Sequence, residues 1–485
     1  MITSSHKSYL NQFEGQTDIG AVNLPGSYKY DPNQQGFTIL GAGANIWGDQ
    51  DIFHFVWKRM SGNFIVTMHA AWIEVGGNPH RKFGWMARTR LEPSSPHVST
   101  AIHGDGLLSL QFRRIPGSQT AEVKASFTGA DVIQLERKDN TFIMSVARYG
   151  EPFTTLQAAD IDLGNEVYLG LFVCSHEQDI IEQAAFQDVR IIVPVKEAFE
   201  RGRDPFGSHL ELLELSSGHR QIIYSSDEVF EAPNWTRDGQ ALIYNKNGRL
   251  FRFDLATGTP ALIDTGEVAS NNNDHVISFD GSLLAISSHT GKENKSLVYT
   301  VPLQGGRPKL VNSAGPSYLH GWSPDGKFLV YTARRNGQFD IYRIPSGGGE
   351  EVQLTDTPGL DDGPEYTPDG KYIYFNSVRS GRMQIWRMQP DGSYLEQMTD
   401  DEYNNWFPHF SPDGKCFVFL SYLEGEVEPS DHPPARRVYL RLMSLDGGSP
   451  RVLAYLYGGQ GSMNVPAWSP DGKRLAFVSN TVPYQ

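Results

Sequence analysis

The chain has 485 residues, a net charge of -14 at pH 7 and a pI near 5.5. That length is too great for one ordinary hydrophobic core, so we expect two domains. The acidic balance argues against a nucleic-acid-binding protein, because phosphate binding needs clustered cations. The 49 glycines, 29 prolines and 12% aromatic residues are typical of a turn-rich β protein. Two widely separated cysteines, Cys174 and Cys416, give no sign of a disulfide framework.

The first residues do not resemble a targeting segment. Residues 1–7 lack the basic-then-apolar pattern of a secretory signal, and no apolar run reaches the length of a membrane span. If Met1 is the native start, we expect a cytoplasmic protein. If a signal peptide was removed, we expect a periplasmic or secreted one.

Residues 1–194 are predicted to form a β-sandwich. Short stretches of alternating apolar and polar residues begin at Phe37, and turns of Gly, Asn and Asp separate them. Examples lie at 53–57, 64–68, 107–111, 142–146 and 167–173. The charged stretch 195–206, which contains Arg-Gly-Arg-Asp-Pro, is predicted to be a linker.

Three motifs of this region resemble those of the concanavalin-like jelly rolls attached to many secreted bacterial glycan enzymes: Ile46-Trp-Gly-Asp, Gly84-Trp-Met-Ala-Arg and Tyr168-Leu-Gly-Leu-Phe. The resemblance implies a binding module or a structural companion rather than a catalyst. The candidates for a sugar groove are Trp47, Trp57, Trp72, Trp85 and His54. We expect most of them in the core, because a sandwich buries aromatic residues at alternate strand positions.

Residues 207–485 contain six copies of a repeat centred on an Asp-Gly turn. The copies are Trp235-Thr-Arg-Asp-Gly, Ile277-Ser-Phe-Asp-Gly, Trp322-Ser-Pro-Asp-Gly, Tyr366-Thr-Pro-Asp-Gly, Phe410-Ser-Pro-Asp-Gly and Trp468-Ser-Pro-Asp-Gly. Their aspartates are 42 to 45 residues apart, apart from a last interval of 58 that contains an insertion at 424–437. Asp-Gly is a hairpin signal, and three further strands follow in most copies. Four strands per repeat predict a six-bladed β-propeller.

The propeller is predicted to close by pairing its beginning with its end. Few residues remain after Ser479, so the sixth repeat lacks its outer strands. Residues 210–215 and 220–224 have the pattern of a third and a fourth strand, with Ser-Ser-Gly between them. Closure of the ring removes exposed sheet edges.

These repeats resemble those of TolB and its relatives, which include the oligogalacturonate lyases. The resemblance covers residues 207–485 and implies the fold more than the function, because propellers of this kind carry many activities. The lyase relatives imply a manganese site at the propeller mouth with clustered histidines. That clustered pattern is not matched in this chain.

One face of the predicted propeller gathers polar residues. The segments that enter the first strand of each blade lie on the same face as the loops between the second and third strands, which defines the mouth. Amides and arginines there suit a hydroxyl-rich or anionic ligand, and aromatic rings suit stacking on a sugar. The candidate substrate-binding residues are Glu231, Asn273, Tyr318, Arg335, Arg379, Asn405, Trp406, Gln460 and Asn464.

Histidines and a carboxylate on this face are the candidate catalytic residues: His275, His320, Asp362 and His432. His275 and His320 occupy the register that holds proline in the other four blades. His275, His320 and His432 are also candidate ligands of one divalent ion, either Mn, Ca or Zn. The chain has no short metal motif and no nucleotide-binding motif, so we expect no nucleotide cofactor.

Two functions follow from these features. In the first, the protein cleaves a glycosidic bond of an oligosaccharide, as a lyase or a hydrolase. A histidine acts as base or metal ligand, and an arginine or a metal neutralises the developing negative charge. In the second, it is a TolB-like binding or scaffold protein that recognises a glycan or a protein partner without chemistry. Both predict an oligosaccharide or another small polar ligand, no nucleic acid and no membrane span. Neither predicts the oligomeric state.

Overall fold

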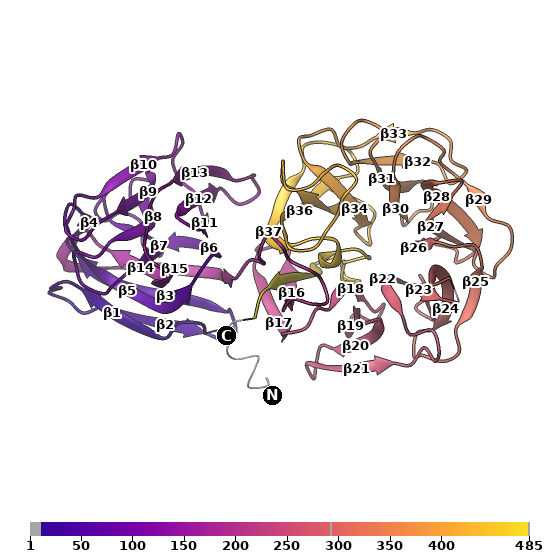
Figure 1. Cartoon of the computed structure of the whole chain (residues 1–485), viewed down its shortest axis with the longest axis horizontal. Helices are drawn as coiled ribbons and strands as arrows, with labels where there is room; N and C mark the ends of the chain where they lie inside the picture. Colours follow the sequence, from indigo (N-terminus) through magenta and orange to yellow (C-terminus); the bar gives the residue numbers. More distant parts are fainter. Residues whose placement is uncertain (1–10, 292, 484–485) are drawn as a thin grey trace. The chain divides into compact units, whose positions relative to one another are not determined.

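The computed structural model describes residues 11–291 and 293–483, so the ends of the predicted domains 1–194 and 207–485 lie outside it. The chain separates into two compact units, and the boundary between them in the sequence lies between Pro194 and Val195 (Figure 1). Both are built from β-strands. Within the described part, no helix is long and apolar enough to cross a membrane.

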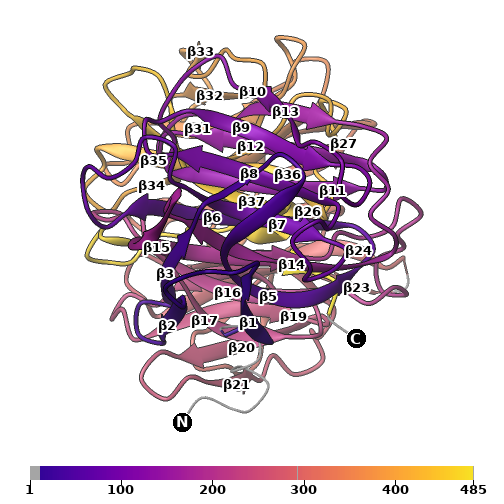
Figure 2. The same cartoon turned by 90° about the vertical axis from the view of Figure 1, so that its left-hand side faces the viewer.

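The N-terminal unit consists of two antiparallel sheets, whose strands run side by side in Figure 2. The first sheet has the order β1 (Gly15–Ile19), β5 (Gln50–Ser61), β14 (Glu166–Cys174), β7 (Lys82–Arg88), β8 (His97–His103), β9 (Leu108–Arg113) and β10 (Ala121–Lys124), with β4 (Asn45–Trp47) beside β5. The second has the order β13 (Thr154–Ala158), β12 (Thr141–Ala147), β11 (Val132–Lys138), β6 (Phe64–Trp72), β15 (Glu177–Ile192), β3 (Gly36–Gly43) and β2 (Ser27–Asp31).

Apolar residues at alternate positions of both sheets form one core. Phe83 and Trp85 of β7 belong to the same buried cluster as Val66 and Met68 of β6. Two sheets that share a core agree with the alternating pattern of the sequence. The concanavalin-like assignment stays a prediction.

The predicted sugar-groove aromatics are distributed between core and surface. Trp85 is fully buried, and Trp57 and Trp72 are half-buried against the two hydrophobic clusters of this unit. His54 is buried and its Nδ1 lies 2.7 Å from a carboxylate oxygen of Asp18. Of these five residues, Trp47 is the most exposed, at 41%.

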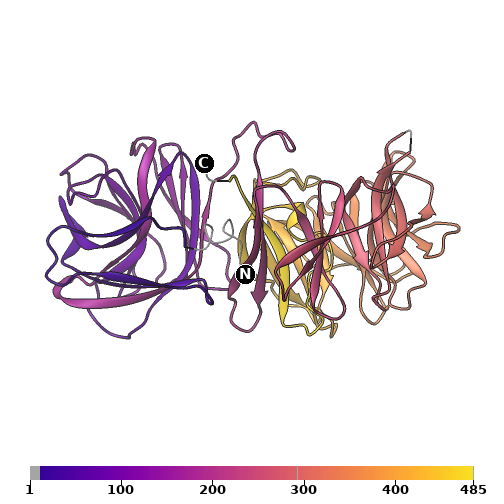
Figure 3. The same cartoon turned by 90° about the horizontal axis from the view of Figure 1, so that it is seen from below.

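The C-terminal unit is a six-bladed propeller, as the repeats predict, and Figure 3 shows it edge-on. Five blades have four strands each: β18 (Glu231–Trp235), β19 (Ala241–Lys246), β20 (Arg249–Asp254) and β21 (Thr259–Ile263) in blade 1; β22 (Asn271–Ile277), β23 (Leu283–Thr290), β24 (Lys295–Pro302) and β25 (Lys309–Asn312) in blade 2; β26 (Ser317–Trp322), β27 (Phe328–Arg335), β28 (Gln338–Pro345) and β29 (Val352–Gln353) in blade 3; β30 (Asp361–Tyr366), β31 (Ile373–Ser377), β32 (Gln384–Met388) and β33 (Glu396–Gln397) in blade 4; β34 (Asn404–Phe410), β35 (Cys416–Tyr422), β36 (Arg436–Ser444) and β37 (Arg451–Gly458) in blade 5.

The sixth blade closes the ring with strands from both ends of the unit. Strand β38 (Arg474–Thr481) pairs with β16 (Gly207–Glu214), which pairs with β17 (Arg220–Ser226). An isolated bridge between Trp468 and Leu475 marks the short innermost strand, which follows the 3-10 turn η1 (Gln460–Ser462). The predicted closure is therefore confirmed, and the strand edges that an open ring would expose are paired.

The six Asp-Gly turns are structural. In each, a Ser or Thr hydroxyl donates to the aspartate at 2.6–2.7 Å. In blade 3, Asp325 also accepts the amide of Lys327 at 3.1 Å, and Gly326 has a φ of 71°, which glycine adopts at little cost. Because each turn follows the innermost strand, the turns lie on the face opposite the strand entries.

Residues 195–206, predicted to be a linker, belong to the propeller unit and are called the strap below. The amide of Val195 donates to the hydroxyl of Tyr457 at 3.0 Å. The rings of Phe199 and Phe206 lie 5.1 Å apart, centroid to centroid. The strap thus packs on the propeller and contributes to its surface.

Candidate binding site at the propeller mouth

Six residues occupy equivalent positions in the six blades, in or just before the innermost strand. Each stands two positions before the proline or histidine register of its blade. This mouth ring consists of Glu231, Asn273, Tyr318, Asp362, Trp406 and Asn464. All six are among the residues that the sequence predicts for the site.

Irregular backbone accompanies this ring. The ladder between the first two strands shifts register near the ring in blades 1 to 5. Ala232 and Phe407, which follow ring residues, have φ angles of 57° and 55° although neither is glycine. A bulge of this kind redirects side chains and is frequent beside functional sites.

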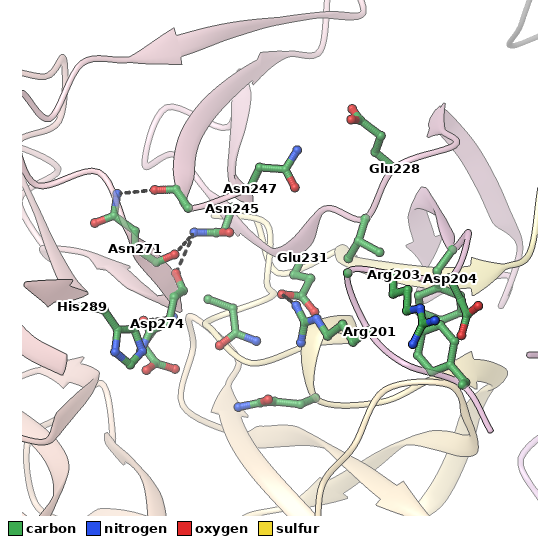
Figure 4. A pocket seen from close by; sticks show the side chains of 18 of the residues that line it. Arg201, Arg203, Asp204, Glu228, Glu231, Asn245, Asn247, Asn271, Asp274 and His289 are labelled. Atoms are coloured by element: carbon green, nitrogen blue, oxygen red, sulfur yellow. Dashed lines mark hydrogen bonds and ion pairs between the residues drawn. The ribbon is translucent and has the colours of Figure 1, made fainter. Parts of the chain in front are cut away.

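A pocket of about 630 Å³ opens beside the ring, and Figure 4 shows its lining. Glu231, Asn273, Tyr318 and Gln460 of the predicted residues line it. Blade 2 contributes Asp274 and His289, and the strap contributes residues 199 and 201–206. The entry segments of blades 1, 2, 3 and 6 therefore meet at one concave site.

Hydrogen bonds from asparagine side chains fix the backbone that forms one side of this pocket. The side-chain amide of Asn245 donates to the carbonyl oxygens of Asn271 and Asn272 at 3.0 and 2.7 Å. The amide of Asn271 donates to the carbonyl of Gly248 at 2.9 Å (Figure 4). These bonds tie the beginning of β22, where the ladder of blade 2 shifts register, to blade 1, and they satisfy buried backbone carbonyls.

Glu231 is paired with a strap residue. Its carboxylate accepts a hydrogen bond from the Arg201 guanidinium at 2.6 Å, and the two side chains lie side by side in Figure 4. The Glu231 side chain is 9% exposed, whereas that of Arg201 is 49% exposed. A nearly buried carboxylate needs such a partner because water no longer solvates it.

A second charged cluster joins three of the four predicted catalytic residues. His320 and His432 lie 3.2 and 3.5 Å from the two carboxylate oxygens of Asp362. Burial would raise the pKa of Asp362, yet the hydrogen bonds and charges of both histidines hold it well below its ordinary value. Burial alone would lower the pKa of His320, but Asp362, with the charges of Asp274 and Glu365, raises it above its ordinary value. The buried Asp362 and His320 therefore each favour the charged form of the other.

Asp274 connects this cluster to the pocket. It is 3% exposed, it lines the pocket and it accepts a hydrogen bond from the Asn464 amide at 2.7 Å. Burial raises its pKa, while His320 opposes that shift. The Asn464 amide also donates to the side-chain oxygen of Asn273 at 3.3 Å, so a second ring residue helps to hold the amide that meets this carboxylate.

His275, the fourth predicted catalytic residue, lies in the interior of its blade. Its side chain is fully buried and its Nε2 lies 3.2 Å from the carbonyl oxygen of Ile243. Burial lowers its pKa to about 4, so the ring is neutral at physiological pH. This geometry corresponds to a packed core histidine rather than to a base at the mouth.

The two predicted ligand-clamping arginines are engaged by carboxylates of the chain. Arg335 binds Glu351 through two nitrogens, at 2.7 and 2.9 Å. Arg379 donates to Asp361 at 2.7 Å. Neither lines the pocket, so the expectation of an arginine clamp for an anionic ligand is corrected to two internal ion pairs.

Two further predicted residues are structural. Trp406 is fully buried in a hydrophobic cluster of the propeller and presents no ring face to a sugar. Asn405 is fully buried and donates to Gln384 and Asp401 at 2.9 and 3.0 Å.

The donors do not fit the predicted divalent ion. Throughout residues 11–291 and 293–483, no three His, Cys, Asp or Glu side chains converge closely enough to hold a metal. His320 and His432 are instead turned to the oxygens of Asp362. The cofactor prediction is therefore unconfirmed.

Two residues of the site were missed by the sequence. Asp274 follows Asn-Asn-Asn and has the composition of an ordinary turn, and its adjacency to His275 was the available signal. Arg201 lies in a stretch typical of a linker. Its place in the pocket depends on the strap packing on the propeller, which no local pattern indicates.

Comparisons with known proteins agree with this architecture. The sequence profile of the TolB beta propeller domain, PD40, matches residues 276–434. A protein of Agrobacterium fabrum, Atu1656, described as uncharacterized, is 46% identical over 272 residues, which make up 56% of this chain and 92% of that protein. The chain belongs to the TolB-like β-propeller family.

Solved structures extend the comparison. A structure from Agrobacterium tumefaciens with a provisional TolB assignment is 46% identical, with a TM-score of 0.55, and the match covers 57% of this chain and 99% of that one. An oligogalacturonate lyase in complex with manganese is 15% identical, with a TM-score of 0.37, over 56% of this chain and 78% of that one. The similarity to the lyase concerns the fold alone.

Proposed function

We propose that this TolB-like protein is a binding protein whose propeller mouth holds a small polar ligand or a polar segment of a partner, without cleaving it. The observation that carries the proposal is the pocket of about 630 Å³ at the mouth, which is lined by side chains of four blades and the strap. A concave site with several convergent polar groups is the usual form of a ligand site. The N-terminal unit is proposed to be its concanavalin-like companion.

Glycosidic cleavage receives less support from the geometry. His275 is enclosed in its blade, and Arg335 and Arg379 are neutralised by Glu351 and Asp361. An elimination needs a base and a group that stabilises developing negative charge at the same place. The two arginines that line the pocket, Arg201 and Arg203, are likewise paired with Glu231 and Glu200.

A screen with two tryptophan variants tests the proposal. His289 is half-buried at the pocket edge, so His289→Trp fills part of the site. Lys327→Trp places the same ring in an Asp-Gly turn on the opposite face, where the Lys327 side chain is 73% exposed. Small polar compounds, with uronate-containing and neutral oligosaccharides among them, are tested by thermal shift.

We expect at least one compound to stabilise the wild type and Lys327→Trp but not His289→Trp, because binding to the folded state raises the melting temperature. A compound that stabilises all three proteins equally would contradict a site at the mouth. Release of new reducing ends or unsaturated uronates from a bound oligosaccharide would contradict binding without chemistry and would restore the enzymatic hypothesis.

A further inference from the structure

The charges of the pocket are dominated by carboxylates. Two of the residues that line it, Glu231 and Asp274, are acidic and less than 10% exposed. Arg201 is the cation that meets Glu231, and the Asn464 amide meets Asp274. The second arginine of the lining, Arg203, is turned to Glu200 at 2.9 Å. The buried part of the pocket is therefore an acceptor for positive charge.

The Glu231 end of the pocket has a fixed shape. A Cβ at Gly461 would overlap the Glu231 carboxylate, so the bare backbone of η1 is what gives this side chain its place. Gln460, next to it, lines the pocket and supplies an amide oxygen. Both residues belong to blade 6, whereas Glu231 begins blade 1. The carboxylate is thus held between two blades and cannot simply turn to solvent.

Arg201, a residue of the strap, fills the Glu231 end of the pocket with its side chain. Its side chain is 49% exposed, and the strap itself is an irregular surface segment. An ion pair with one solvated partner contributes little to stability, so a competing cation can replace Arg201 without disturbing the blades. A guanidinium matches a carboxylate through two parallel hydrogen bonds.

Tyr318 supplies an aromatic surface in the same pocket. Tyr318 is partly exposed and lines the cavity. Burial raises the pKa of its hydroxyl, and the negative charges of Asp274 and Asp362 raise it further. The neutral ring therefore persists at physiological pH. The face of a tyrosine ring attracts a guanidinium or an ammonium group.

We propose that the mouth binds its ligand through a cationic group, preferably a guanidinium, and that Arg201 of the strap occupies the place of that group when the ligand is absent. The inference rests on the proposed binding function and adds the chemical class of the ligand. It reverses the charge that the sequence suggested for the ligand, because the arginines behind that expectation are paired elsewhere.

Calorimetric titration with argininamide tests the inference, and the neutral citrullinamide serves as the control ligand. We expect argininamide to bind the wild type, and Arg201→Ala to bind it about fivefold more tightly, since the ligand no longer displaces an internal cation. Lys196→Ala is the matched control on the same strap, because Lys196 does not line the pocket and its side chain is 80% exposed, so this variant should bind like the wild type. Glu231→Gln, nearly isosteric, should bind at least tenfold more weakly.

Equal binding of argininamide and citrullinamide, or unchanged affinity in Arg201→Ala, would overturn the inference. The test still works if Glu231→Gln does not fold. Arg201→Ala alone can overturn the inference, and this variant is expected to fold because the Arg201 side chain is half exposed on the strap. If uncharged or anionic compounds bind in a manner that His289→Trp abolishes while argininamide does not bind, the cation class is wrong and the binding function stands. If no compound responds to His289→Trp, the binding function itself is wrong.

A pentapeptide with a central arginine distinguishes the two sources of such a group. Tighter binding of Gly-Gly-Arg-Gly-Gly than of argininamide, lost in Glu231→Gln, supports the inference with a partner polypeptide as the source. Tighter binding of argininamide, lost in the same variant, supports it with a small molecule. Binding of both that Glu231→Gln leaves unchanged overturns it.

Discussion

Replacing Asp362 by Asn should destabilise the propeller, and the loss should grow as the pH falls. The Asp362 side chain is 11% exposed and that of His320 is 6% exposed, so their pair is buried. Removal of one partner from a buried pair costs about 3–5 kcal/mol. We expect a loss at the lower end of this range, about 3 kcal/mol near pH 6. The backbone amide of Gly363 donates to Asp362 at 2.8 Å, and the side-chain oxygen of Asn can still accept that hydrogen bond.

The pH dependence follows from the direction of the pKa shift. The folded pKa of His320 is raised, so its stabilisation is fully present below the unfolded pKa of about 6.5 and is lost as the pH rises through the folded value. Without Asp362, burial dominates and keeps His320 neutral, so the variant loses stability as the pH falls below about 6.5. The difference between the two proteins therefore increases toward acid pH.

Thermal unfolding at pH 5.5 and 8.5 measures this difference. About 3 kcal/mol corresponds to roughly 6–9 °C for a unit of this size, and we expect most of it at pH 5.5. Asp361→Asn is the matched control, because the neighbouring Asp361 pairs with Arg379, which stays charged at both pH values. A loss in Asp362→Asn that is equal at the two pH values, or larger at pH 8.5, would refute the assignment of the ion pair.

Two other substitutions test residues that the structure removes from the binding site. Trp406→Ala should lower the free energy of unfolding by about 3–5 kcal/mol in urea, because a fully buried indole leaves a large cavity; a near-neutral effect would mean that the ring is not in the core. Arg335→Ala should lower the free energy of unfolding by about 2–3 kcal/mol, because the partly buried Glu351 carboxylate loses its partner. Ligand affinity should stay unchanged, because Arg335 does not line the pocket. Adding Glu351→Gln should recover part of that loss, and a strictly additive double variant would contradict the pairing.

The propeller could be predicted from the sequence because its signals are local. Each Asp-Gly turn contains its own hydroxyl-to-carboxylate bond, as in the pair of Ser323 and Asp325 at 2.6 Å. The strand pattern after each turn also identified the closure by β16 and β38. The ring position that includes Glu231 and Asp362 followed from the same register.

The partners of the site residues could not be predicted in this way. Alternation does not reveal that Trp406 turns into the core where the ladder shifts register, next to Phe407 with its φ of 55°. The arginines looked available because Glu351 lies 16 residues from Arg335 and shares no motif with it. The strap was missed because its pairing with Glu231 spans 30 residues of intervening chain.

Hydrogen–deuterium exchange with the strongest ligand of the screen tests the binding site most directly. We expect slower exchange at the mouth, in the entry segments of β18 and β22 and in the strap, and unchanged exchange in the Asp-Gly turns. Protection confined to those turns or to residues 11–194 would contradict the claim that the propeller mouth is the binding site.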